Sequence, residues 1–197
     1  MKLDLYCPNK YAAKLGEYVM PDATYTDAPA QVLFSAQADA SLHPVVILDG
    51  ADELVGFFCV QTGPGPARYG YYNDNYALVR SFSVDQRYRG RGYASRTMEQ
   101  LFEFVNERIC ERVSNLVLAV NEQNLAAQKA YARAGFAIVQ SGVAGRVGDV
   151  YIMEKIKPAP ITIEPCPSIA ERVGAQLSAG FGAFLDRSVL QNQQVCA

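Results

Sequence analysis

The sequence has little of several residue types on which common catalytic and metal sites depend. It contains a single histidine, His43, and no tryptophan among its 197 residues. No C-x-x-C pair occurs among its five cysteines, which are Cys7, Cys59, Cys110, Cys166 and Cys196. Zinc sites need clusters of cysteine and histidine, and catalytic triads of this kind need a histidine beside a nucleophile, so we expect no metal and no triad chemistry. Scattered cysteines behind an N-terminus without a signal-peptide core are typical of reduced thiols, and we expect a cytoplasmic protein.

Strong net charge and long apolar runs are also missing. The 18 Lys and Arg residues against 20 Asp and Glu residues give a formal net charge of −2. Nucleic-acid-binding domains are usually strongly basic, so we expect no nucleic-acid partner. No apolar run approaches the roughly 20 residues that a membrane-spanning helix needs, so we expect no membrane partner either.

The hydrophobic pattern that is present predicts alternating strands and helices. We expect a β-α-α-β-β-β-α-β-α-β-β order, with elements near residues 2–6, 9–18, 28–40, 43–50, 51–63, 76–84, 94–109, 115–120, 124–136, 136–140 and 149–156. Asn124 is expected to cap the start of the last helix and Gly135 its end. Such an order predicts an α/β (α+β) fold, in which a mixed sheet carries helices on both faces.

The strand at residues 76–84 alternates at a period of two. This pattern predicts two faces, one of them formed by Tyr76, Leu78, Arg80, Phe82 and Val84. After Lys157, the segment "PAPITIEPCPSI" contains four prolines and is typical of a linker, and residues 171–190 have weak amphipathic helical spacing. We therefore expect one domain at residues 1–157 and a C-terminal extension at residues 158–197.

One segment, "DQRYRGRGYASRTMEQLFEFV" at residues 85–105, joins this strand to the clearest helix of the chain. Backbone N–H groups are unpaired at the start of a helix, and the helix dipole is positive there. Gly90 and Gly92 remove side chains, so a pyrophosphate could contact the backbone, with nearby arginines adding charge-assisted bonds. The dinucleotide pattern G-x-G-x-x-G fails because Ser95 stands at the third glycine, and no Walker motif is present. RNA binding through the Arg-Gly stretch and a plain exposed basic turn remain alternatives.

A second block favours the phosphate-binding alternative. Arg87-x-x-Gly90-x-Gly92 resembles the Q/R-x-x-G-x-G/A acetyl-CoA signature of the GNAT N-acetyltransferase superfamily. About 30 residues later, Asn124-x-x-Ala127-x-x-x-Tyr131-x-x-x-Gly135-Phe136 resembles the later helix and strand of the same family. The resemblance covers residues 1–157, most firmly 76–140, and implies the GNAT fold with a mostly antiparallel sheet. It also implies acetyl-CoA as co-substrate and transfer of its acetyl group to an amine by direct attack on the thioester.

The resemblance assigns roles to individual residues. It implies that the backbone of Phe82, Ser83 and Val84 pairs with the pantetheine arm of the cofactor, and that Asn124 contacts it nearby. The pyrophosphate would lie on the loop and first helical turn, which are Arg89, Gly90, Arg91, Gly92, Tyr93, Ala94 and Ser95. Tyr131 stands where members of the family carry the tyrosine that protonates the departing thiolate. The alternative roles are a helix cap alone for Asn124 and core packing for Tyr131.

The general base is left unassigned. Some members of the family carry a glutamate at the position of Leu78, and Asp74 in the preceding loop is the nearest carboxylate in the sequence. Tyr76 and Arg80, on the face of Leu78, are expected to line the acceptor pocket. An amine with a pKa of about 10 is mostly protonated at neutral pH, so some group has to remove its proton.

The acceptor expected from the resemblance is a small primary amine, with a polyamine-like molecule as one candidate. A polyamine pocket should be acidic, and Arg80 argues against one unless it is paired. A GNAT-fold protein that binds acyl-CoA without turnover is the alternative function. Pairing of two subunits as a homodimer is a further expectation from the family.

Overall fold

A seven-stranded sheet organises the residues that the computed structural model describes, which are 1–20 and 23–158. Its strand order is β1-β2-β3-β4-β5-β7-β6. The strands are β1 (Lys2–Leu5), β2 (Leu42–Leu48), β3 (Leu54–Gln61), β4 (Tyr76–Val84), β5 (Asn115–Asn121), β6 (Ala137–Ala144) and β7 (Asp149–Ile156). Only β4 and β5 are parallel, and the other neighbours are antiparallel. The expected mixed, mostly antiparallel sheet is confirmed.

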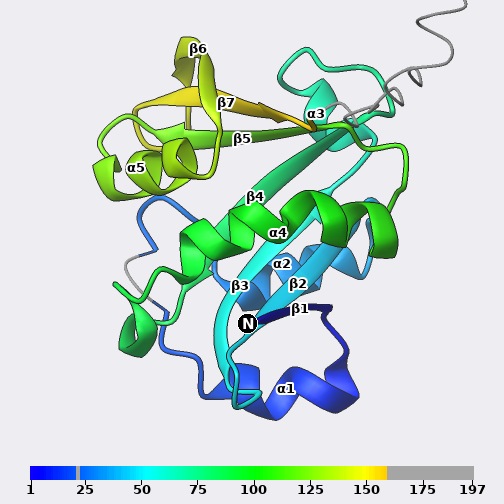
Figure 1. The fold of residues 1–197 in the computed structure, drawn as a ribbon, viewed down its shortest axis with the longest axis vertical. Helices are drawn as coiled ribbons and strands as arrows, with labels where there is room; N and C mark the ends of the chain where they lie inside the picture. Colours follow the sequence, from blue (N-terminus) through cyan, green and yellow to red (C-terminus); the bar gives the residue numbers. More distant parts are fainter. Residues whose placement is uncertain (21–22, 159–197) are drawn as a thin grey trace, which may run out of the picture. The chain divides into compact units, whose positions relative to one another are not determined.

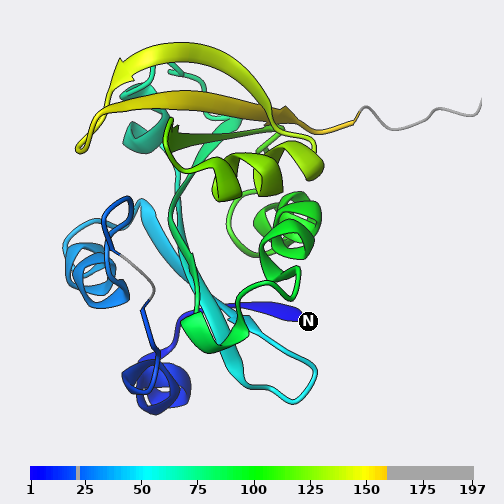
Figure 2. The same cartoon turned by 90° about the vertical axis from the view of Figure 1, so that its left-hand side faces the viewer.

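Helices cover both faces of this sheet (Figure 1). They are α1 (Pro8–Gly16), α2 (Pro29–Ala36), α3 (Pro64–Ala67), α4 (Tyr93–Arg108) and α5 (Leu125–Arg133), with a 3₁₀ turn, η1, at Gln86–Tyr88. Figure 2 shows α1 and α2 on one face and α4 and α5 on the other. The short helix α3 lies in a segment for which no helix or strand was expected from the sequence. Met1–Pro158 form one compact unit, while the expected linker and the helix at residues 171–190 lie outside the described residues.

Local signals in the sequence explain where the helices begin and end. Proline occupies the first turn of α1 and α2, where its missing N–H costs nothing. The Asn124 side chain caps α5 by accepting a 3.2 Å hydrogen bond from the Ala127 N–H. Gly135, with φ of 89°, follows the end of the same helix in a left-handed conformation. Both capping predictions are confirmed.

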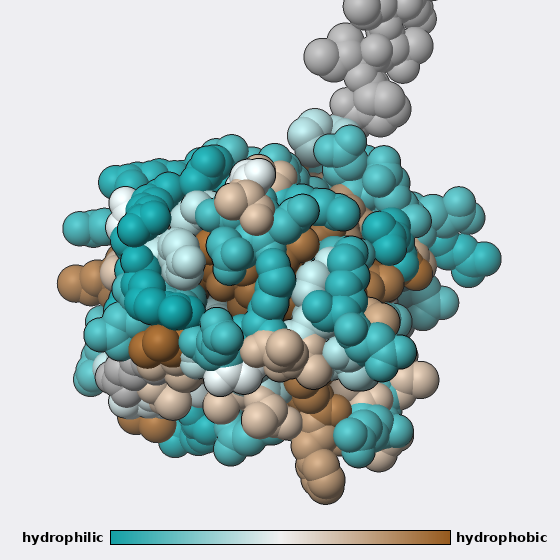
Figure 3. All heavy atoms as spheres, turned by 90° about the horizontal axis from the view of Figure 1, so that it is seen from below, coloured by the Kyte–Doolittle hydropathy of each residue, from teal (hydrophilic) through white to brown (hydrophobic). Residues whose placement is uncertain are grey.

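Two apolar layers hold the helices on the sheet. The face under α4 and α5 packs around Met98, Leu101 and Val105, each fully buried. The opposite face packs around Tyr11 of α1 and Val32 of α2. Across residues 1–20 and 23–158, no helix has both the length and the apolar character required to cross a membrane. The underside of the molecule is mostly hydrophilic, with hydrophobic residues in separate patches (Figure 3).

A bulge in β4 interrupts the alternation predicted for this strand. Its register with β3 shifts between Phe57 and Cys59, and Ser81 adopts a φ of 53°, which is unusual for a residue other than glycine. Leu78 packs on one face, whereas Phe82 packs with the core on the other. The prediction that Leu78 and Phe82 share a face is therefore wrong, because the bulge shifts every side chain after it by one position.

Strands β4 and β5 separate along their length. Residues 76–79 of β4 pair with residues 115–118 of β5, and no pairing continues beyond them. Residues 80–84 thus have β3 on one side and no strand on the other within the described residues. This leaves an open strand edge in the middle of the sheet, next to the start of α4 (Figure 2).

Candidate functional site

The loop before α4 presents unpaired backbone donors. Gly90 and Gly92 have φ of 76° and 77°, and a Cβ added at either would meet nothing within 4 Å. In the described part of the chain, the N–H groups of residues 90–95 donate to no other residue. Together with the dipole of the 16-residue helix α4, these donors form a site suited to a phosphate group.

Several arginines lie near these backbone donors and, within the described residues, do not form ion pairs across them. Arg91 lies over the Tyr88 ring at 5.2 Å, and Arg96 lies over the Tyr93 ring at 4.8 Å. Arg89 is exposed and forms no ion pair with the described residues. The charge near the loop is therefore positive, as an anionic ligand requires.

A buried carboxylate that the sequence analysis did not single out holds this loop. The Asp85 side chain is fully buried and accepts hydrogen bonds from the backbone N–H groups of Arg87 and Val19, at 2.9 and 3.0 Å. Its carboxylate is also bound by the Arg87 guanidinium, with an Nη2–Oδ2 distance of 2.8 Å. Arg87, the first residue of the resemblance motif, therefore serves the loop through Asp85. A sequence signal was available, since aspartate often caps a turn.

Replacing Asp85 with asparagine is expected to lower the free energy of unfolding by about 2 kcal/mol, because buried donors lose a charged acceptor. Burial alone would raise the pKa of Asp85, but the hydrogen bonds from Arg87 and Val19 outweigh it and lower the pKa. The stabilisation is then complete above the ordinary pKa of about 4 and is lost as the pH falls through the lowered value. Urea unfolding of Asp85→Asn and of the exposed control Asp74→Asn tests this. Equal midpoints for the two variants would contradict it.

Tyr131 of α5 lies beside the open half of β4. Its ring meets Phe82 edge-on at 6.3 Å and Phe136 at 6.1 Å, and it is 8% exposed. The hydroxyl has no hydrogen-bond partner among the described residues, and burial raises its pKa. The group is therefore protonated at neutral pH and free to donate to a ligand.

Asn124 is a helix cap in the structure, but capping uses only its side-chain oxygen. The half-buried side chain keeps its amide donors without a partner in the described residues. The two roles considered for Asn124 are thus compatible. Ser83 is buried and accepts a 2.8 Å hydrogen bond from the Tyr18 hydroxyl, so its side chain supports the strand from the opposite face.

A cavity of about 640 Å³ opens where β4 and β5 separate. It is lined by β4 and β5, by the β6–β7 turn, by residues 24–27 and by the end of α3. Leu78 and Arg80 line it, whereas Tyr76 is not among its lining residues and packs on Tyr71 at 4.6 Å. Asp74 is exposed and does not line it either.

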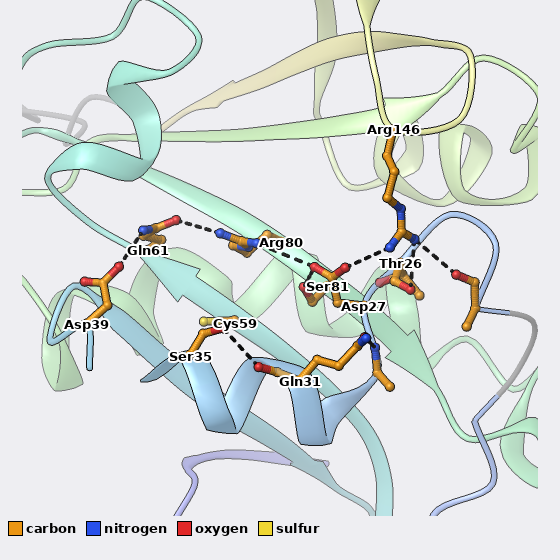
Figure 4. Close-up of polar contacts among 12 residues, drawn as sticks. Thr26, Asp27, Gln31, Ser35, Asp39, Cys59, Gln61, Arg80, Ser81 and Arg146 are labelled. Carbon is orange, nitrogen blue, oxygen red and sulfur yellow. Dashed lines mark hydrogen bonds and ion pairs between the residues drawn. The ribbon is translucent and has the colours of Figure 1, made fainter. Parts of the chain in front are cut away.

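Asp27 is the one carboxylate among the described residues that line this cavity. Arg80 and Arg146 both point at it in Figure 4, from β4 and from the β6–β7 turn. The contacts join residues more than 50 positions apart, so no local pattern in the sequence could have revealed them. Asp27 was not among the site residues predicted from the sequence.

Comparison with known proteins gives consistent results. A family model described as Acetyltransferase (GNAT) family matches residues 11–136. The chain is 34% identical over 119 residues to the uncharacterized N-acetyltransferase YbbJ of Bacillus subtilis (strain 168), covering 58% of this chain and 71% of that protein.

Solved structures share the fold at low sequence identity. A complex of AAC(6')-Ib with paromomycin and acetyl-CoA has a TM-score of 0.64 at 16% identity, covering 79% of this chain and 92% of that one. A chimera of the spermidine N-acetyltransferase SpeG from Vibrio cholerae and hSSAT has a TM-score of 0.59 at 15% identity, covering 79% and 94%. These two structures therefore support the fold and do not indicate a particular acceptor.

Proposed function

The chain belongs to the acetyltransferase (GNAT) family and is an acetyl-CoA-dependent N-acetyltransferase, and from this premise we propose that its acceptor is the primary amine of a small molecule. The observation that carries the proposal is that two features of the structure lie next to the same half of β4. The unpaired donors at the start of α4 and the 640 Å³ cavity both adjoin the unpaired half of β4. A nucleotide thioester and an acceptor could thus meet at one strand.

In the proposed complex, the pyrophosphate is bound by backbone N–H groups from Arg89 through Ser95. The pantetheine arm lies along the free edge of β4, next to the backbone of Phe82, Ser83 and Val84. The open edge supports this because peptide-like amides of a ligand can replace the missing strand. The unpaired amide donors of Asn124 lie on the α5 side of the same opening.

Acetyl-CoA supplies a thioester whose carbonyl carbon is open to attack by a neutral amine. The new C–N bond forms as the C–S bond breaks, and the amine gives up its proton while the sulfur gains one. Tyr131 is proposed to donate the proton to the sulfur, which is supported by its protonated hydroxyl and by the lack of a hydrogen-bond partner for that hydroxyl in the described residues. A thiol has an ordinary pKa of about 8.5, so the thiolate is already a fair leaving group and the help required is modest.

The proposal also locates the reaction in the cytosol, as the cysteine pattern predicts. Cys7, Cys59 and Cys110, the three cysteines within the described residues, are free thiols. Free thiols are typical of proteins in a reducing compartment.

Hydrogen exchange with and without CoA tests the binding part of the proposal. We expect CoA to slow exchange at residues 90–95 by about tenfold or more, because its phosphates would bond these amides, while exchange in the β2–β3 turn should stay unchanged. A thiol-release assay with acetyl-CoA and a panel of amines then tests turnover. Protection without release by any amine would favour the alternative, an acyl-CoA-binding protein without turnover. No protection at residues 90–95 would overturn both.

A further inference from the structure

The side chains that line the acceptor cavity carry an excess of positive charge. Arg68, Arg80 and Arg146 line it together with one carboxylate, Asp27. A polyamine would enter such a cavity against like charge. The charge of the cavity therefore contains information about the acceptor that neither the family nor the neighbouring structures provide.

Asp27 is already shared between two of these arginines. Arg146 Nη1 lies 3.1 Å from Asp27 Oδ1, and Arg80 Nη2 lies 3.5 Å from Asp27 Oδ2. The Ser81 hydroxyl donates to the same Oδ2 at 3.2 Å. A cationic acceptor would have to compete with these two guanidinium groups for the carboxylate.

The second contact of Arg80 is neutral. Its Nη1 donates to the Gln61 side-chain oxygen at 3.0 Å. Asp39 reaches only the other end of that amide, where Gln61 Nε2 donates to Asp39 Oδ2 at 3.2 Å (Figure 4). The glutamine thus holds the Arg80 guanidinium in place without neutralising it.

Arg68 has no acidic partner in the described residues. It follows the end of α3, is exposed, and its guanidinium lies over the Tyr69 ring at 5.7 Å. Stacking on an aromatic ring leaves the N–H donors at the edge of a guanidinium free. These donors form a planar fork that fits the two oxygens of a carboxylate or of a phosphate.

We propose that the acceptor is an amine that also carries an oxyanion, a carboxylate or a phosphate, and that the oxyanion binds to Arg68 and Arg80; this rests on the proposed function. When the oxyanion engages Arg80, the shared carboxylate of Asp27 becomes available for the ammonium group of the same molecule. The oxyanion would thus give Arg68 and Arg80 a partner of opposite charge, whereas a polycation would add positive charge to a cavity that already has an excess of it.

Matched amines test the proposal. Methionine is compared with methioninamide, and phosphoethanolamine with ethanolamine, with spermidine as the polycation. We expect kcat/KM to be at least about 10-fold higher for the anionic member of one pair than for its partner. The reason is that its oxyanion would form charge-assisted hydrogen bonds with the arginines. The amine of an amino acid amide is less basic than that of the acid and so reacts more readily, which biases the first pair against the proposal. The pair that shows the effect identifies the oxyanion.

Variants locate the effect. Arg68→Gln is expected to reduce the preference for the anionic amine to less than about 3-fold. Arg112→Gln, an exposed arginine outside the cavity, is the matched control and should keep the preference. Calorimetric titration of the same amines into the CoA-loaded protein gives a second readout that does not need turnover.

The outcomes separate this inference from the proposed function. Faster acetylation of spermidine than of either anionic amine would overturn the inference and uphold the function. If no amine is acetylated, the proposed function fails, and the titration still decides the inference: equal binding of charged and neutral amines, or no binding of any, overturns it. A preference that survives Arg68→Gln overturns the role of Arg68.

Discussion

Replacing Tyr131 with phenylalanine is expected to lower kcat by about 10²–10⁴-fold, the usual range for loss of a general acid. The ring contacts with Phe82 and Phe136 would remain, so the cofactor side of the opening should keep its shape. The hydroxyl has no partner in the described residues, and its removal should leave the free energy of unfolding unchanged or slightly higher. Steady-state kinetics and urea unfolding measure the two effects.

Tyr11→Phe is the matched control for this variant. Tyr11 of α1 is also a buried tyrosine, and it lies away from the cavity. Its hydroxyl donates a 2.6 Å hydrogen bond to the Asp4 carboxylate. We expect it to lose about 1 kcal/mol of stability and to keep kcat. A reduction of kcat by less than about threefold in Tyr131→Phe would mean that solvent protonates the thiolate and that Tyr131 is a packing residue.

Replacing Gly92 with aspartate is expected to weaken binding of acetyl-CoA by about 100-fold or more. At about 5 Å and an effective dielectric of 20, each pair of like charges costs about 3 kcal/mol, and the new carboxylate would face the pyrophosphate. Aspartate tolerates positive φ better than most residues, and a negative charge favours the start of a helix. The folded state should therefore survive, and titration with acetyl-CoA measures the affinity.

Two further variants separate charge from bulk and from backbone strain. Gly92→Asn adds nearly the same volume without the charge, and we expect it to lose less affinity than the aspartate. Gly142→Asp places a carboxylate at another glycine with positive φ and no atom within 4 Å of its Cβ, but in β6. Loss of affinity in the β6 variant as large as in Gly92→Asp would show that the effect is not local to the phosphate site.

Local patterns in the sequence predicted most of the fold. The order of strands and helices followed from apolar spacing, and Asn124 and Gly135 marked the ends of α5 because capping depends on residues close in the sequence. The short helix α3 was missed because "GPGPA" contains residues that usually interrupt helices. The loop–helix site was predicted for the same local reason, since glycines before an amphipathic helix are visible without any tertiary contact.

The parts that were missed depend on tertiary contacts. Serine at position 81 carries no sequence signal for a positive φ, so the bulge in β4 and the change of face at Phe82 could not be anticipated. Likewise, Asp85 is fixed partly by Val19, and Asp27 by Arg80 and Arg146, which only the folded chain brings together. The strand β4 was predicted, but the face of the sheet on which the side chains after the bulge lie was not.

The bulge at Ser81 has a consequence for how this enzyme could diversify. Ahead of it, β4 contributes Leu78 and Arg80 to the proposed acceptor cavity; behind it, Phe82 packs against Tyr131. In the proposed complex, acceptor preference and thioester chemistry would thus depend on separate halves of a single strand. On this proposal, substitutions ahead of the bulge would change which amine binds and leave the half that contacts the cofactor intact. Deletion of one residue there would shift the side chains of both halves.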